Sequence, residues 1–168
     1  MLDSSRLRSL IAQHCGVAVQ SVHAYIAGEH GDSEIPLWTS ATVGGVPLLR
    51  WDDPQLTPLT AAERDDIGSQ VAQAGYQILR GKGYTNYAVA LATARIIEAV
   101  LYDEHQVLAV SSLLTDYHGI SDVCLSVPSV VNRTGVLRVL PVPLSGDERD
   151  GLYRSARAVR AVIDRLGL

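Results

Sequence analysis

The sequence predicts an α+β fold in which long helices pack on antiparallel strands. Two observations favour this class over a doubly wound parallel sheet. Predicted helices and strands come in blocks, with hairpin-like strand pairs late in the chain. The Gly-x-Gly at residues 81–83 follows a predicted helix, and the sequence contains no GxGxxG signature. We therefore expect a single domain over residues 1–168, with the Rossmann domain absent.

The first half of the chain is expected to begin with a helix and continue through two strands. Residues 2–15 carry apolar side chains at helical spacing, and Gly16 ends the pattern. Residues 21–27 alternate, with His23 on the face opposite Val22, which is typical of a half-buried strand. The following segments are expected to be a polar loop at 28–34, a strand at 37–43 closed by Gly44-Gly45, and a loop at 51–58.

Two capping-box signatures mark helix starts in the second half. Thr60 to Glu63 opens a helix that runs to about Arg80, and Ser145 to Glu148 opens one that ends at Gly167. Residues 84–102 predict another helix, which is apolar on almost all sides and is expected to be largely buried. Strands are expected at 107–114, 123–127 and 136–142, with a turn at 132–135.

Composition narrows the classes of function. With 47% hydrophobic and 19% charged residues, 168 residues suffice for a real core. The net charge of −4 gives no electrostatic case for nucleic acid. The most apolar stretch stops at Arg95, too short to span a bilayer. Cys15 and Cys124 form no CxxC pair, so we expect no metal site. We expect a cytoplasmic chain without signal peptide or membrane partner.

The segment Gly28-Glu29-His30-Gly31-Asp32-Ser33 is the most unusual in the chain. It lies between two predicted strands and is rich in small, charged and titratable residues. Taken alone, it could be a plain turn in which His30 only structures the loop. In the functional interpretation, His30 is a general acid and base, because imidazole exchanges protons near neutral pH.

Four segments, in the same order along the chain, resemble NAD-dependent L-lactate dehydrogenases of the lactate/malate dehydrogenase family. They are the active-site histidine segment at 28–33, the helix start Leu2-Asp3-Ser4-Ser5-Arg6-Leu7-Arg8, the pocket helix at Lys82-Gly83-Tyr84-Thr85, and a late hairpin at Leu125-Ser126-Val127-Pro128 with Gly135-Val136. The resemblance covers the whole chain, but only the C-terminal, substrate-binding half of the family. It implies NAD as cofactor, a small 2-oxo or 2-hydroxy acid as substrate, and a homo-oligomer, which is a tetramer in the intact enzyme.

The resemblance implies roles for four residues. His30 would give its proton to the pyruvate carbonyl oxygen, and Asp3 would pair with His30. Arg6 would clamp the substrate carboxylate through two parallel hydrogen bonds. Thr85 would line the small end of the pocket, where threonine resembles lactate more than malate dehydrogenases. Each residue also has an ordinary interpretation: Asp3 as a helix N-cap, Arg6 as an exposed helix charge, and Thr85 as a helix cap.

The same resemblance implies a second site, formed by Arg8 and His23. Arg6 and Arg8 point about 200° apart on a helix, so they cannot serve one small site. In bacterial lactate dehydrogenases, an arginine and a histidine at the positions of Arg8 and His23 bind the allosteric effector fructose 1,6-bisphosphate across a subunit interface. Two cationic groups suit a phosphate. The alternative is ordinary surface charge.

We expect the chain by itself to be catalytically silent, because the cofactor domain and the carbonyl-polarising groups of the family have no counterpart in it. The face that packs on that domain in the family would be bare, so self-association is expected. Three other functions stay open. They are a malate dehydrogenase-like substrate domain, a non-catalytic oligomerisation or effector-binding module, and a hydrolase using Ser33 with His30. The last is disfavoured because no GxSxG elbow is present.

Overall fold

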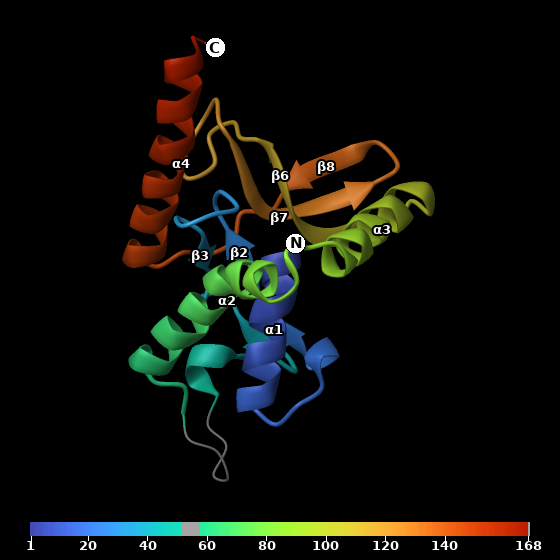
Figure 1. The fold of residues 1–168 in the computed structure, drawn as a ribbon, viewed down its shortest axis with the longest axis vertical. Coiled ribbons are helices and arrows are strands. Elements are labelled where there is room, and N and C mark those ends of the chain that lie inside the picture. The colour runs from blue at the N-terminus through green and yellow to red at the C-terminus, as the bar shows by residue number, and fades with distance from the viewer. Residues whose placement is uncertain (52–57, 168) are drawn as a thin grey trace.

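The computed structural model describes residues 1–51 and 58–167, and in these ranges four α-helices surround three small sheets (Figure 1). The helices are α1 Leu2–His14, α2 Ala61–Lys82, α3 Tyr87–Leu101 and α4 Gly146–Leu166. Short 3-10 turns lie at Val19–Ser21 and Leu48–Arg50. Every strand pair within the described ranges is antiparallel, which confirms the α+β class.

The largest sheet is the late one, as the hairpin pattern predicted. It joins β6 Gln106–Leu113, β7 Cys124–Asn132 and β8 Gly135–Val139 in sequence order. A second sheet has the order β1-β4-β5, from Val22–His23, Thr42–Val43 and Val46–Pro47. The smallest pairs β2 Ile26–Ala27 with β3 Ile35–Pro36.

Both predicted capping boxes are confirmed. The Thr60 hydroxyl accepts a hydrogen bond from the Glu63 amide, and the Ser145 hydroxyl accepts one from the Glu148 amide. Helix α2 runs two residues past the predicted end at Arg80 and stops where Gly83 adopts a left-handed conformation, φ 81°.

Two strand predictions were wrong in detail. The alternating segment 21–27 is not one strand: β1 and β2 pair in different sheets. The predicted strand at 37–43 is interrupted by a turn, in which the Ala41 amide donates to the Trp38 carbonyl, and pairing resumes at Thr42. Alternation indicates that a segment is extended, but it does not specify which strand the segment pairs with, so a change of partner within the segment is not visible in the sequence. Most of the predicted loop at 51–58 lies outside the described residues.

The core divides into separate clusters. One joins α1 to β1, β4 and α2 through buried side chains that include Leu7, Ile11, Val22, Val43 and Val71. A second joins β7 to α4 and contains Leu125, Val127 and Leu152. Helix α1 therefore belongs to the first cluster and α4 to the second.

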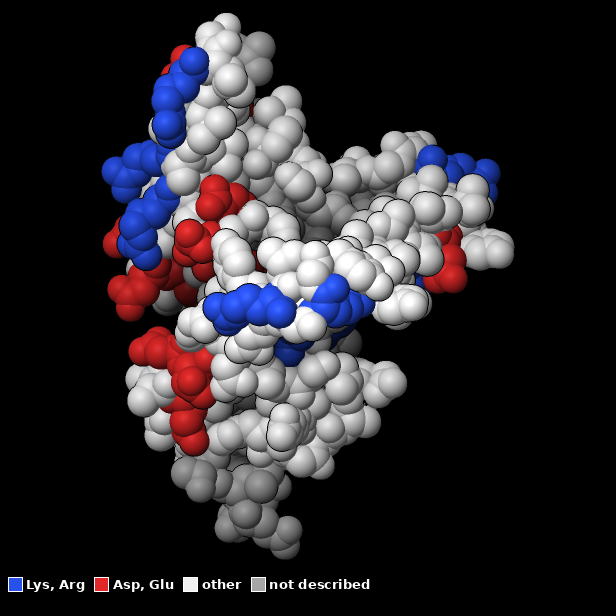
Figure 2. All heavy atoms as spheres, in the orientation of Figure 1, with Lys and Arg blue, Asp and Glu red and all other residues white. Residues whose placement is uncertain are grey.

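The expectation that residues 84–102 are largely buried was wrong. Only Ala99 of α3 is fully buried, whereas Tyr87 and Leu91 are 74% and 73% exposed. An apolar sequence predicts burial only if a partner covers the helix. Figure 2 shows that most side chains over α3 are uncharged in this view, while Lys and Arg side chains gather along α4. No helix in the described ranges is both long and apolar enough to cross a membrane.

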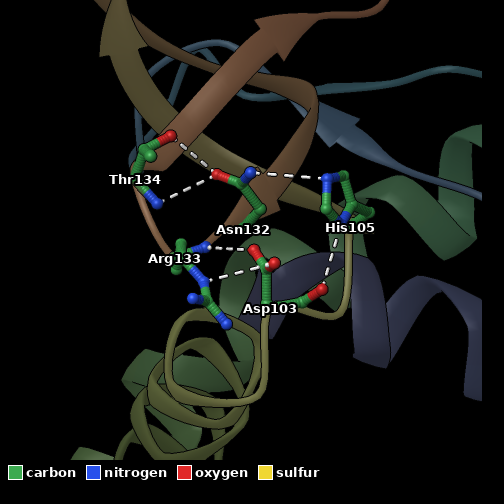
Figure 3. Close-up of polar contacts among 5 residues, drawn as sticks. All are labelled: Asp103, His105, Asn132, Arg133 and Thr134. Carbon is green, nitrogen blue, oxygen red and sulfur yellow. Dashed lines mark hydrogen bonds and ion pairs between the residues drawn. The ribbon is translucent and has the colours of Figure 1, made fainter.

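The turn after α3 is fastened to the turn between β7 and β8 (Figure 3). The Asp103 carboxylate accepts a hydrogen bond from the Arg133 amide at 3.1 Å and pairs with the Arg133 guanidinium at 3.2 Å. Nδ1 of His105 lies 2.9 Å from the Asp103 carbonyl, and its Nε2 lies 3.4 Å from the Asn132 amide. These contacts hold the free end of the hairpin against α3.

Candidate active site

The carboxylate of Asp3 joins two of the predicted site residues. Its Oδ2 lies 2.8 Å from Nδ1 of His30, and its Oδ1 accepts a hydrogen bond of 2.8 Å from Nη1 of Arg6. The Asp3 side chain is only 10% exposed, whereas that of His30 is 77% exposed. The pairing turns Nδ1 of the imidazole inward and leaves Nε2 as the ring nitrogen free for another partner.

Local structure brings these side chains together. Asp3 sits in the first turn of α1, and the neighbouring Ser4 hydroxyl accepts a hydrogen bond of 2.9 Å from the Ile26 amide of β2. That bond fixes the start of α1 beside β2, and the chain then enters the loop that carries His30. One turn along α1, Arg6 reaches back to Asp3, as residues three apart on a helix do.

The His30 loop is held from two further sides. Gly28 exchanges backbone hydrogen bonds of 2.8 and 2.9 Å with Ser126 of β7. The hydroxyl of Ser155 on α4, which is fully buried, accepts a hydrogen bond of 2.7 Å from the Glu29 amide. The Ser33 hydroxyl also donates to Ser155, at 3.1 Å. Ser33 is therefore directed at α4, which counts against its use as a nucleophile with His30.

A cavity of about 280 Å³ opens beside this cluster. Asp3, Arg6, His30 and Thr85 all line it, so the structure brings together the four residues that the sequence predicted for the catalytic and substrate site. Its apolar lining comes from α2, through Ala72, Tyr76 and Leu79. A volume of this size admits a molecule of a few non-hydrogen atoms, with a guanidinium and an imidazole in its wall.

The ordinary interpretations of Asp3, Arg6 and Thr85 were wrong. The residue at the N-cap of α1 is Met1, and Asp3 lies inside the helix. Arg6 is bonded to Asp3 and only 18% exposed. The residue at the N-cap of α3 is Asn86, so Thr85 precedes the cap.

Sequence reasoning missed Glu34. Glu34 lines the small cavity, and one carboxylate oxygen each from Glu34 and Asp3 and one ring nitrogen of His30 lie within 4.8 Å of one another. Burial, together with the negative charge of Asp3, raises the pKa of Glu34 to about 7, although the positive charge of Arg6 opposes the shift. Nothing in the local sequence pattern distinguishes Glu34, whereas Ser155 could have been noticed as a polar residue on the predicted apolar stripe of α4.

The same three side chains offer the donor atoms that a metal ion would need. The Arg6 guanidinium already bonds to Asp3, and its fixed positive charge disfavours a cation there. We therefore propose no metal at this cluster.

Arg8 and His23 lie apart from the cavity. The Arg8 guanidinium donates to the Ser5 hydroxyl at 3.0 Å, while Arg6 bonds to Asp3, so the two arginines have different partners. Nε of Arg8 is buried without a hydrogen-bond partner among the residues described. His23 is exposed and its neighbour Val22 is buried, as the alternating pattern predicted. In residues 1–51 and 58–167, no hydrogen bond or ion pair joins Arg8 to His23.

Comparison with known proteins places this geometry in a family. The family described as the lactate/malate dehydrogenase, alpha/beta C-terminal domain matches residues 1–166. The chain is 54% identical over 167 residues to an L-lactate dehydrogenase of Bifidobacterium animalis subsp. lactis, covering 99% of this chain and 52% of that protein. It is 45% identical to an L-lactate dehydrogenase of Kosmotoga olearia, covering 98% of this chain and 52% of that protein.

A solved structure agrees. The minor L-lactate dehydrogenase of Enterococcus mundtii in its ligands-bound form superposes with a TM-score of 0.92 at 35% identity, covering 98% of this chain and 52% of that one. The chain thus spans about half the length of the relatives it matches. The family match over 166 residues, together with this fold, shows that the chain belongs to the lactate/malate dehydrogenase C-terminal domain family.

Proposed function

We propose that this chain is the substrate-binding half of an NAD-dependent L-lactate dehydrogenase, an oxidoreductase that interconverts pyruvate and L-lactate. The observation that carries the proposal is the Asp3 carboxylate, which contacts His30 through one oxygen and Arg6 through the other, at the edge of a small cavity. Both relatives described above are L-lactate dehydrogenases, which favours lactate over the alternative, a malate dehydrogenase.

His30 acts as the acid and base. Its Nδ1 is turned to Asp3, so its Nε2 is the atom that can give a proton to the carbonyl oxygen of the substrate. Asp3 fixes the orientation of the ring, because its carboxylate contacts Nδ1 at 2.8 Å. The exposure of the His30 side chain leaves it open to an incoming substrate.

Arg6 and Thr85 position the substrate. A guanidinium carries five N–H donors in one plane, and Nη1 of Arg6 uses one of them on Asp3. The remaining donors can grip the substrate carboxylate through two parallel hydrogen bonds. Thr85, on the wall of the same cavity, limits the room at the methyl end of pyruvate.

NAD does not fit the residues described here. Gly81 and Gly83 close helix α2, whereas a dinucleotide fold needs a glycine loop between a strand and a helix. We infer that NAD binds outside these residues; when bound, its reduced nicotinamide supplies the hydride. We propose that residues 1–168 form one domain. We expect this chain by itself to have little or no catalytic activity.

The proposal can be tested with a chimaera. The chain is joined to the preceding, cofactor-binding half of the Bifidobacterium animalis relative, and NADH oxidation is followed with pyruvate and with oxaloacetate. We expect pyruvate to be reduced faster, activity to be lost in His30→Gln, and no activity in the 168-residue chain alone. A folded chimaera that binds NADH but leaves pyruvate unreduced would refute the assignment.

We further propose that Arg8 and His23 bind fructose 1,6-bisphosphate in the intact enzyme. The Arg8 guanidinium gives one hydrogen bond to Ser5 and keeps further N–H donors, and His23 is exposed, so both side chains can offer donors to a phosphate. The sugar phosphate should activate the chimaera more strongly at mildly acidic pH, where histidine is charged. An unchanged activation curve in the Arg8→Gln, His23→Ala double variant would remove the proposal.

We also propose that the intact protein is a cytoplasmic homo-oligomer, a tetramer as in the family. The exposed apolar side chains of α3 support association. Cys15 and Cys124 are free thiols, which suits a reducing compartment.

A further inference from the structure

Glu34 lines two cavities, and no ion pair joins it to another side chain within residues 1–51 and 58–167. It lines both the small substrate cavity and a neighbouring one of about 610 Å³ between the start of α1, α3 and β6. Its Oε1 atom is buried and has no hydrogen-bond partner in the part of the chain that is described. An ionised carboxylate in this position would be compensated only in part, because the guanidinium of Arg6 is bonded to Asp3 and acts on Glu34 from further away.

The nearest carboxyl group is that of Asp3. Two ionised carboxylates this close repel each other, whereas a protonated one can donate a hydrogen bond to the other. Burial and the charge of Asp3 are the main causes that raise the pKa of Glu34 to about 7. Near neutral pH a large share of Glu34 therefore carries a proton, and Asp3 is the acceptor within reach.

Other charged and titratable groups act on this pair from every packed element. They are Arg6 and the amino group of Met1 from α1 and its start, Glu29 and His30 from the loop, Tyr76 from α2, and Cys124 from β7. Of these, Arg6 and the Met1 amino group favour the ionised form of Glu34. His30 becomes a third such cation when it is protonated.

We propose that Glu34 is a positioning residue for the acid–base pair: in its protonated form it donates a hydrogen bond to Asp3, and in its ionised form it adds negative charge beside His30. Protonation of His30 and of Glu34 is then coupled, since the charge of each alters the other through Asp3. The proposal deepens the proposed function, which gives His30 its acid–base role, but its test does not depend on catalysis.

The test follows the ring signals of His30 by NMR during a pH titration of the 168-residue chain. Glutamine at position 34 has the same shape as the protonated acid and can donate to Asp3, but it never ionises. In Glu34→Gln, His30 should lose its proton at a pH lower by roughly half a unit, the effect of one charge about 5 Å away at a water-exposed group. Asp32→Asn removes an exposed carboxylate from the same loop and should leave the curve unchanged.

A second measurement needs no variant. In the wild-type chain labelled with carbon-13, the side-chain carboxyl signal of Glu34 should change near pH 7, and not near 4.5 as for an ordinary glutamate. A Glu34 transition below pH 5, or identical His30 curves in wild type and a folded Glu34→Gln, would overturn the proposal. The two proposals can fail separately. If Glu34 and His30 titrate as expected but the chimaera does not reduce pyruvate, the proposed function is refuted and the role of Glu34 is not.

Discussion

The hydroxyl of Ser155 accepts a hydrogen bond of 2.7 Å from the Glu29 amide, although 126 residues separate the two along the chain. Glu29 precedes His30 directly, so this bond fixes the loop of the proposed acid–base residue to helix α4. Ser155 is fully buried and cannot exchange its partners for water. The position of His30 therefore depends on α4 as well as on α1.

Ser155→Ala is expected to destabilise the chain by about 1–3 kcal/mol, because it leaves the partly buried Glu29 amide without its acceptor. The free energy of unfolding in urea measures the effect. Ser69→Ala, at an exposed site on α2, gives the change in helix propensity together with the loss of one exposed hydrogen bond, from the Gln73 side chain. Equal effects of the two variants would show that the Ser155 bond contributes nothing.

Gly28→Ala should be more costly than the same change at Gly44. Both glycines have positive φ, 97° and 57°, which any other residue adopts only with strain of about 1–3 kcal/mol. A Cβ at Gly28 would also meet Oγ of Ser155 at 2.7 Å and Cδ1 of Ile35 at 3.0 Å, whereas at Gly44 it would meet nothing within 4 Å. The melting temperature of Gly44→Ala reports the backbone strain alone, and the further decrease in Gly28→Ala reports the steric clash of the added Cβ. Equal melting temperatures of the two variants would contradict this account.

Arg6→Lys should lower kcat/KM for pyruvate roughly 10- to 100-fold in the chimaera. An ammonium cannot hold Asp3 and a carboxylate in one plane, and a charge-assisted hydrogen bond is worth about 1.5–3 kcal/mol. Steady-state kinetics measure the loss. Arg8→Lys makes the same exchange two residues along the helix, and it should leave the kinetics without effector unchanged. Similar losses in both variants would argue against Arg6 as the clamp.

Acid should weaken the ion pair and the hydrogen bond between Asp103 and Arg133. The hydrogen bond from the Arg133 amide is the main cause that lowers the pKa of Asp103 below its ordinary value of 3.8. The Asp103 carboxylate therefore stabilises the folded chain above pH 3.8, and this stabilisation is lost as the pH falls through the lowered pKa of the folded state. Asp103→Asn removes the charge of the side chain, and asparagine tolerates the backbone φ of 56° observed at this position. Urea midpoints of wild type and variant should differ at pH 6, and the difference should shrink as the pH falls below 3.8. A constant difference between the two would exclude the carboxylate as its source.

The features that could be predicted from sequence are those with local causes. Thr60 and Ser145 start their helices through contacts three residues away, and Gly83 ends α2 by its own conformation. The Asp3–His30 pair was predictable only because a whole family shares its motifs. Glu34 and Ser155 were missed because their roles depend on partners at a distance in sequence or in another element. The exposure of α3 was missed since burial depends on what covers a helix.

The exposed face of α3 should drive association of the chain. Leu91 is 73% exposed on an apolar helix, and burying a leucine side chain stabilises a contact by about 1.5–3 kcal/mol. Leu91→Lys should therefore weaken self-association roughly 10- to 100-fold, which light scattering over a concentration series measures. Leu49→Lys changes a leucine that is 52% exposed outside α3 and should leave association as in wild type. A wild-type chain that stays monomeric at high concentration would contradict this account of the α3 face.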